Sequence, residues 1–160
     1  MKTIKFIIFT LVVISSFIAC GEKPIIEIKD GTYRGVFDVK NNEGEYIFGI
    51  CGLQALVEIN NNNTMNFTMK SVKFTEEMPA IDMKVMGVIT EKSKDRLILS
   101  LPKDEIIPVD GEGVLLPQYK ITELEGFITI DHLRFSMLCG EYYVSFWTNI
   151  LNYQIKRRDI

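Results

Sequence analysis

The sequence offers few side chains suited to nucleophilic or acid–base catalysis. His132 is the only histidine in the chain, which excludes zinc sites and serine triads built on several histidines. Cys51 or Cys139 could act as a thiol nucleophile with His132 as its base. However, His132 follows Asp131 at the predicted start of a strand, where a turn or surface position is the usual role. The sequence therefore predicts no enzyme.

Cys51 and Cys139 are better explained as a disulfide. Two cysteines in one small domain favour a bond outside the reducing cytoplasm. A bond that closes a loop of this length stabilises a fold by roughly 4 kcal/mol in the chain-entropy model. We therefore predict a Cys51–Cys139 disulfide, although the sequence does not show whether the two Cα atoms lie within bridging range.

Acidic side chains gather in a stretch rich in proline and glycine, and they are Asp104, Glu105, Asp110 and Glu112. Carboxylate oxygens suit calcium, but this spacing does not match an EF-hand loop. A solvated acidic loop is the preferred interpretation. The chain also lacks a glycine-rich motif for phosphate, so we predict no metal ion and no cofactor.

The N-terminus indicates export. Lys2 and Lys5 precede an apolar run over residues 6–18, which is too short for an ordinary membrane span and is typical of a secretory signal. The following Phe17-Ile18-Ala19-Cys20 resembles the lipobox of bacterial lipoproteins, with Phe17 in place of leucine. This resemblance implies cleavage before Cys20 and lipid on its side chain and amine. Two or more acyl chains anchor a protein stably, so the membrane is a predicted partner.

These features predict a domain organisation and a location. Residues 1–19 are the predicted lipoprotein signal peptide, residues 20–30 a lipidated tether, and residues 31–160 a single domain. Surface-export signals of such bacteria are acidic, and Glu22 is the only acid just behind the cysteine, so we favour the periplasmic side of the outer membrane over the cell surface. With 18 basic and 21 acidic residues before the leader is removed, nucleic acid is not a predicted partner.

The rest of the chain has the period of β-strands. Met65, Phe67 and Met69 alternate with polar residues, as in a half-buried strand, and the asparagine run at 60–63 is a turn signal. Glycines around Cys51 predict a bulge. Strands are expected near residues 32–40, 45–59, 64–74, 81–90, 96–101, 119–130, 133–137 and 141–149. About eight antiparallel strands indicate an all-β up-and-down barrel, with a β-sandwich as the alternative.

Three short motifs carry a family resemblance: Gly31-Thr32-Tyr33-Arg34-Gly35, Phe74 with Met78-Pro79-Ala80-Ile81-Asp82, and Gly126-Phe127-Ile128-Thr129-Ile130. In these motifs the chain resembles the calycin-like, or lipocalin-like, lipoproteins of Bacteroides-type bacteria, over most of residues 30–149. The resemblance implies a small antiparallel β-barrel on the outer membrane. Lipocalins open with Gly-x-Trp, whereas Tyr33 holds the aromatic position here and the sole tryptophan is Trp147. A lipocalin ligand site is therefore not implied.

Methionine is abundant, with seven in the chain, and several share a strand face with phenylalanine. Flexible, polarisable methionines suit an adaptable site for apolar ligands, and they also fill irregular cores. An eight-stranded barrel lies at the boundary between a filled interior and one that holds a small ligand. The candidate ligand-binding residues are Met65, Phe67, Met69, Met83, Phe135 and Met137.

Two functions therefore remain open. The first is a lipid-anchored module without catalytic activity that binds a small apolar ligand inside the barrel. The second is a filled barrel that contacts an envelope protein or a glycan through surface loops, with Tyr119, Tyr142 or Tyr143 as exposed contact residues. We favour the first by analogy of architecture rather than from a recognised site.

Overall fold

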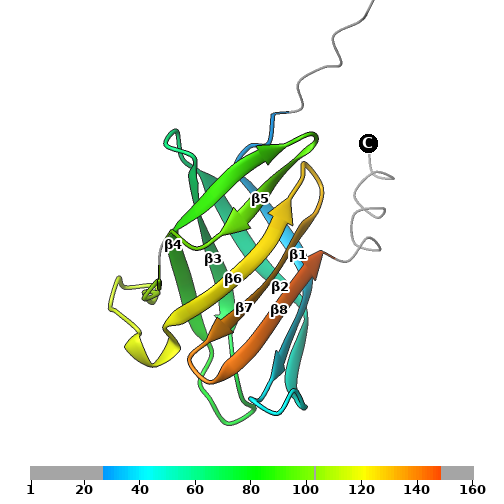
Figure 1. Ribbon diagram of the computed structural model, residues 1–160. Coiled ribbons are helices and arrows are strands. Elements are labelled where there is room, and N and C mark those ends of the chain that lie inside the picture. Colours follow the sequence, from blue (N-terminus) through cyan, green and yellow to red (C-terminus); the bar gives the residue numbers. More distant parts are fainter. Residues whose placement is uncertain (1–26, 103, 149–160) are drawn as a thin grey trace, which may run out of the picture.

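Each strand of the structure pairs with its neighbours in sequence, as expected from the regularly spaced turns. The computed structural model describes residues 27–102 and 104–148. All pairs are antiparallel, and the last strand pairs with the first, so the sheet closes into a barrel (Figure 1). This confirms the up-and-down barrel over the β-sandwich. The strands are β1 Gly31–Lys40, β2 Tyr46–Ile59, β3 Thr64–Val72, β4 Ile81–Ser93, β5 Arg96–Ser100, β6 Ile121–Ile128, β7 Leu133–Cys139 and β8 Tyr142–Thr148.

Two differences from the expected boundaries have local causes. A short 3-10 helix at Pro117–Tyr119 delays the start of β6, because the Tyr119 amide donates to the Leu116 carbonyl instead of joining a strand. The strand β4 continues past the expected end at residue 90 as far as Ser93, which pairs with Arg96. The predicted bulge in β2 is present, with Gly52 at φ +83° and a shift of register against β1.

The two ends of the barrel differ. Figure 1 shows the β2–β3, β4–β5 and β6–β7 turns at the upper end and the β1–β2, β3–β4, β5–β6 and β7–β8 connections at the lower end. At the lower end, the Phe74 ring stacks on Tyr119 at 4.5 Å and on Tyr142 at 5.3 Å between ring centroids. Met78 adds a sulfur that accepts from the Tyr119 hydroxyl at 3.1 Å. An aromatic plug of Phe74, Tyr119 and Tyr142 therefore closes this end.

The upper end, which we call the mouth, also holds the first residues that the structure describes. Asp30 accepts a hydrogen bond from the Ile59 amide at 2.7 Å, which fixes the segment before β1 against the end of β2. Glu27 and Ile28 therefore lie beside the mouth. Among residues 27–102 and 104–148, the structure contains no helix of the length and apolar character that crossing a membrane requires.

The predicted disulfide is wrong, since Cys51 and Cys139 are both free thiols. Cys51 is exposed on β2, beside the bulge, whereas Cys139 is buried on β7. The strands β2 and β7 are not neighbours in the sheet. The exposure of Cys51 and the burial of Cys139 place one thiol on the outer face and the other inside the barrel. The Cys139 thiol donates instead to the Tyr119 carbonyl at 3.1 Å, and burial raises the pKa of this thiol to about 12.

Candidate functional site

The six predicted ligand-binding side chains all point into the barrel and meet there. Each is no more than 2% exposed, and the set is Met65, Phe67, Met69, Met83, Phe135 and Met137. The Phe135 ring stacks between Phe67 at 4.8 Å and Phe146 at 5.4 Å. These side chains pack against one another as part of one hydrophobic core. None of the six lines the pocket described next.

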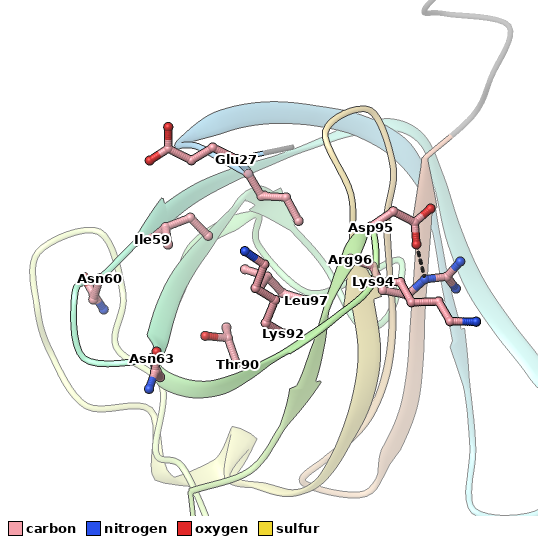
Figure 2. Close-up of a pocket in the computed structure, with 11 residues that line it drawn as sticks. Glu27, Ile59, Asn60, Asn63, Thr90, Lys92, Lys94, Asp95, Arg96 and Leu97 are labelled. Carbon is pink, nitrogen blue, oxygen red and sulfur yellow. Dashed lines mark hydrogen bonds and ion pairs between the residues drawn. The ribbon is translucent and has the colours of Figure 1, made fainter. Parts of the chain in front are cut away.

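A pocket of about 520 Å³ opens at the mouth of the barrel (Figure 2). Its wall combines aliphatic, amide, hydroxyl and charged side chains from β2, β4, β5 and the segment before β1. They are Glu27, Ile28, Ile59, Asn60, Asn63, Thr90, Lys92, Lys94, Asp95, Arg96 and Leu97. Ligand pockets commonly enclose roughly 300–1,000 Å³ and combine apolar walls with a few polar groups. The mouth pocket is therefore the candidate functional site.

A bulge in β4 decides which side chains of this strand enter the pocket. Before the bulge, Met83 and Val85 point inward; after it, Val88 and Thr90 do. The change occurs at Gly87, which has φ +75° and whose amide donates to Asn66 Oδ1 at 3.0 Å. A β-bulge adds one residue to a strand, so each side chain after it points to the opposite face of the sheet. As a result Lys92, rather than Glu91, follows Thr90 on the inner side.

Some of the charged side chains around the pocket form ion pairs and others do not. Glu27 pairs with Lys29 at 3.4 Å, and Asp95 pairs with Arg96 at 3.3 Å. The Arg96 guanidinium also lies over the Phe127 ring on the outer face, 5.0 Å from its centroid. Figure 2 shows Lys92 directed across the mouth, and within the described part of the chain its ammonium forms no ion pair. Lys92 is therefore a cation that faces the pocket and pairs with no carboxylate of the described residues.

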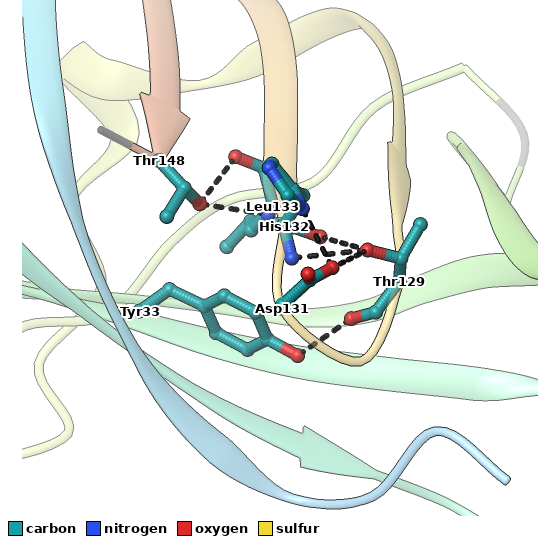
Figure 3. Close-up of polar contacts among 6 residues, drawn as sticks. All are labelled: Tyr33, Thr129, Asp131, His132, Leu133 and Thr148. Atoms are coloured by element: carbon teal, nitrogen blue, oxygen red, sulfur yellow. Dashed lines mark hydrogen bonds and ion pairs between the residues drawn. The ribbon is translucent and has the colours of Figure 1, made fainter. Parts of the chain in front are cut away.

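His132 belongs to a second polar cluster, in the β6–β7 turn (Figure 3). Its Nδ1 lies 2.6 Å from Asp131 Oδ1, and the Thr129 hydroxyl donates to the same oxygen at 2.9 Å. The hydrogen bond from His132 is the main reason that the pKa of Asp131 is lowered. The hydroxyl thus bonds the carboxylate and not the imidazole, whereas a catalytic triad places the imidazole between the two.

Tyr33 ties this turn to β1. Its hydroxyl donates to the Thr129 carbonyl at 2.9 Å across the mouth end of the barrel. Burial, and then the negative charge of Asp131, raise the pKa of Tyr33 to about 12, so the phenol remains a neutral donor. The side chain of Thr148 adds two further bonds to the main chain of Leu133, at 2.8 and 3.0 Å. The cluster therefore braces the rim of the barrel.

The acidic loop takes a structural role. Asp110 Oδ1 accepts hydrogen bonds from the amides of Glu112 and Val114, at 2.9 and 2.8 Å, and so shapes the turn. Glu105 pairs with Lys120 at 3.0 Å. Within residues 27–102 and 104–148, histidine, cysteine and carboxylate side chains form no group of three that could hold a metal ion.

The tyrosines expected as exposed contact residues have different positions. Tyr119 and Tyr142 are half-buried in the aromatic plug, so the expectation of exposure is wrong for both. Their burial raises the pKa of each phenol. Tyr143 is 44% exposed, as expected for a residue of the outer face.

In the comparisons, the chain matches no family model, no curated protein and no solved structure.

Proposed function

We propose that this protein is a lipid-anchored binding module without catalytic activity, and that its small ligand occupies the mouth of the barrel. The mouth pocket, with its mixed lining and a volume of about 520 Å³, is the observation that carries this proposal. The plug at the opposite end supports the mouth as the route by which a ligand enters.

The filled interior favours the mouth over the methionine-rich centre. An eight-stranded barrel holds either side chains or one small ligand. Here Phe67, Phe135 and Phe146 stack at the centre, so a ligand would compete with aromatic contacts for the same space. In this proposal the six predicted residues support the floor of the site, and the ligand contacts the residues above them.

Filling the pocket tests this function. Thr90 is 8% exposed in the pocket wall, and an indole at this position would occupy the space assigned to the ligand. We expect the neutral fluorescent probe N-phenyl-1-naphthylamine to bind the wild-type protein saturably. Thr90→Trp should weaken this binding at least tenfold, as measured by fluorescence titration.

The matched control is Ile98→Trp, which adds the same side chain on the outer face of β5. It should bind the probe as the wild type does. Circular dichroism checks that both variants fold, and Leu97→Trp is the second variant if Thr90→Trp does not. Equal probe binding by the folded pocket variants and the control, or no saturable binding by the wild type, would contradict the proposal.

The anchor is the part of the proposal that rests on the sequence, because the signal peptide, Cys20 and residues 21–26 lie outside the described residues. The resemblance to calycin-like lipoproteins, the outer membrane and its periplasmic side likewise remain predictions. The described chain begins at Glu27, beside the mouth. Because an extended residue spans at most about 3.6 Å, residues 20–27 would hold the mouth within about 25 Å of the anchor. This would keep the pocket near the membrane.

Cys20→Ser tests the anchor in the full chain expressed in a diderm bacterium. We expect the wild-type protein in the outer-membrane fraction. The variant should be found in the soluble fraction or as the uncleaved precursor, because serine cannot take the thioether lipid. Cys51→Ser removes an exposed cysteine of the barrel and should leave the fractionation unchanged. If Cys20→Ser is found in the same fraction as the wild-type protein, the proposed lipid anchor is wrong.

One observation favours the second candidate function, contact with an envelope protein or glycan. The strand register aligns Ile98, Phe127, Arg134, Trp147 and Val36 in one row across the outer face. Ile98 is 39% and Trp147 37% exposed, and aromatic residues with arginine are common in interfaces. Thr90→Trp would leave such a contact intact, which separates this function from binding at the mouth.

A further inference from the structure

We infer that the mouth pocket selects an organic anion, a carboxylate or phosphate with a short apolar chain, whose charged group pairs with Lys92. This inference rests on the proposed function and names the ligand class of the same site.

Charged side chains of both signs line the mouth pocket. Three cations and two carboxylates are among them, and each carboxylate is already paired, Glu27 with Lys29, which does not line the pocket, and Asp95 with Arg96. Asp95 pairs with Arg96, whose guanidinium is drawn to the outer face by the Phe127 ring. Lys92 and Lys94 form no ion pair with a residue that the structure describes, and Figure 2 shows Lys92 directed across the mouth and Lys94 directed away from it. A ligand anion is the group that would complete this arrangement.

The bulge in β4 places Lys92 on the inner side of the rim. Without the bulge at Gly87, Glu91 rather than Lys92 would face inward. The bulge is held by the hydrogen bond from the Gly87 amide to Asn66. One inserted residue therefore changes the charge that the strand presents to the pocket from negative to positive.

The uncharged part of the pocket wall includes an aliphatic surface. Ile28, Ile59 and Leu97 supply aliphatic surface, and Thr90 lies among them as a buried polar residue. The filled core beneath limits how far a chain can extend inward. A short acyl or alkyl chain would cover the aliphatic residues while its charged end reaches the ammonium of Lys92. A charge-assisted hydrogen bond of this kind is about twice as strong as a neutral one.

The test compares ligands that share one chain and differ in charge. Octanoate, octyl phosphate, 1-octanol and octylamine are each titrated against bound N-phenyl-1-naphthylamine at low ionic strength, where exposed charges are least screened. We expect the better of the two anions to displace the probe at a concentration about tenfold lower than 1-octanol. Octylamine should be weaker than 1-octanol. The relative strength of octanoate and octyl phosphate identifies the preferred anion.

Lys92→Gln removes the charge while keeping a polar side chain of similar length. This variant should bind both anions as weakly as it binds 1-octanol, with its affinity for 1-octanol unchanged. The matched control is Lys40→Gln. It makes the same change at the last residue of β1, at the end of the barrel away from the mouth, and should keep the wild-type preference. Loss of the preference in both variants would assign it to overall charge and overturn the inference.

The two proposals fail in different ways. If 1-octanol and both anions displace the probe equally, or if Lys92→Gln keeps the preference, the anion inference is wrong and binding at the mouth stands. If neither the probe nor any octyl compound binds the wild-type protein, both the proposed function and this inference are wrong. Because Lys92 is exposed at the rim, the glutamine variant is expected to fold.

Discussion

Replacing Phe135 with alanine is expected to lower the free energy of unfolding by about 3–5 kcal/mol. The side chain is 1% exposed, and its ring stacks on Phe67 and Phe146 from the neighbouring core. Truncation removes buried apolar surface, leaves a cavity and breaks two aromatic pairs, each worth about 1 kcal/mol beyond the burial of its area. Chemical denaturation followed by circular dichroism measures the change.

The matched control is Phe127→Ala, which makes the same truncation on the outer face of β6. Phe127 lies under the Arg96 guanidinium and is only partly buried, so we expect a cost of about 1 kcal/mol. The comparison separates a packed centre from a hollow one. Equal costs for the two variants would mean that the centre of the barrel is not the tightly packed core that the stacked rings indicate.

Gly126→Ala is expected to destabilise the barrel by about 3 kcal/mol, the upper part of the range for an overpacked interior. Gly126 lies on β6 opposite Phe135 of β7. A Cβ at this position would lie 2.8 Å from the Phe135 Cα and closer still to the Arg134 carbonyl oxygen. Backbone atoms cannot rotate away, so β6 and β7 would have to separate. Thermal and chemical denaturation both report the loss.

Gly111→Ala provides the control for this substitution. The nearest atom to a Cβ at Gly111 is the Asp82 Cβ at 3.4 Å, an ordinary contact. Alanine there reduces the freedom of the unfolded chain, so we expect a change within about 1 kcal/mol in either direction. A Gly126→Ala variant as stable as Gly111→Ala would show that the sheet tolerates a side chain at this close approach of β6 and β7.

The strand pattern could be predicted from the sequence because alternation reports directly on the two faces of a sheet. Met65, Phe67 and Met69 alternate with polar residues, and all three are fully buried in β3. Alternation fails as a guide where a bulge changes the facing. In β4 the odd-numbered Val85 points inward and so does the even-numbered Val88, and a sequence read with one fixed period misplaces the end of that strand.

The mouth pocket was missed for the same reason. The expected strand ends at residue 90, which leaves Lys92 in the connection to the next strand, because a run of charged residues and serine normally marks a turn. The structure extends β4 through this run and carries the lysine to the inner side of the rim. An isolated glycine inside a strand pattern, here Gly87, is the signal that could have revealed the change of facing.

The disulfide prediction failed because spacing along the chain contains no information about position around a barrel. Oxidising conditions make two thiols able to bond, but only the fold brings them together or keeps them apart. Cys51 lies beside the bulge at Gly52, on a strand that pairs with β1 and β3. Cys139 lies on a strand that pairs with β6 and β8.

The closure of the sheet between β1 and β8 has a consequence for the order of folding. Gly35 pairs with Thr148, more than a hundred positions later, so the loop that this pairing closes is nearly the whole domain. Long-range antiparallel pairing slows folding, because the entropy of loop closure is lost before the contacts form. Until β8 pairs with it, β1 keeps one edge unpaired. A chain that has not yet closed the barrel therefore exposes a strand edge on which another chain could pair, and the closed barrel does not.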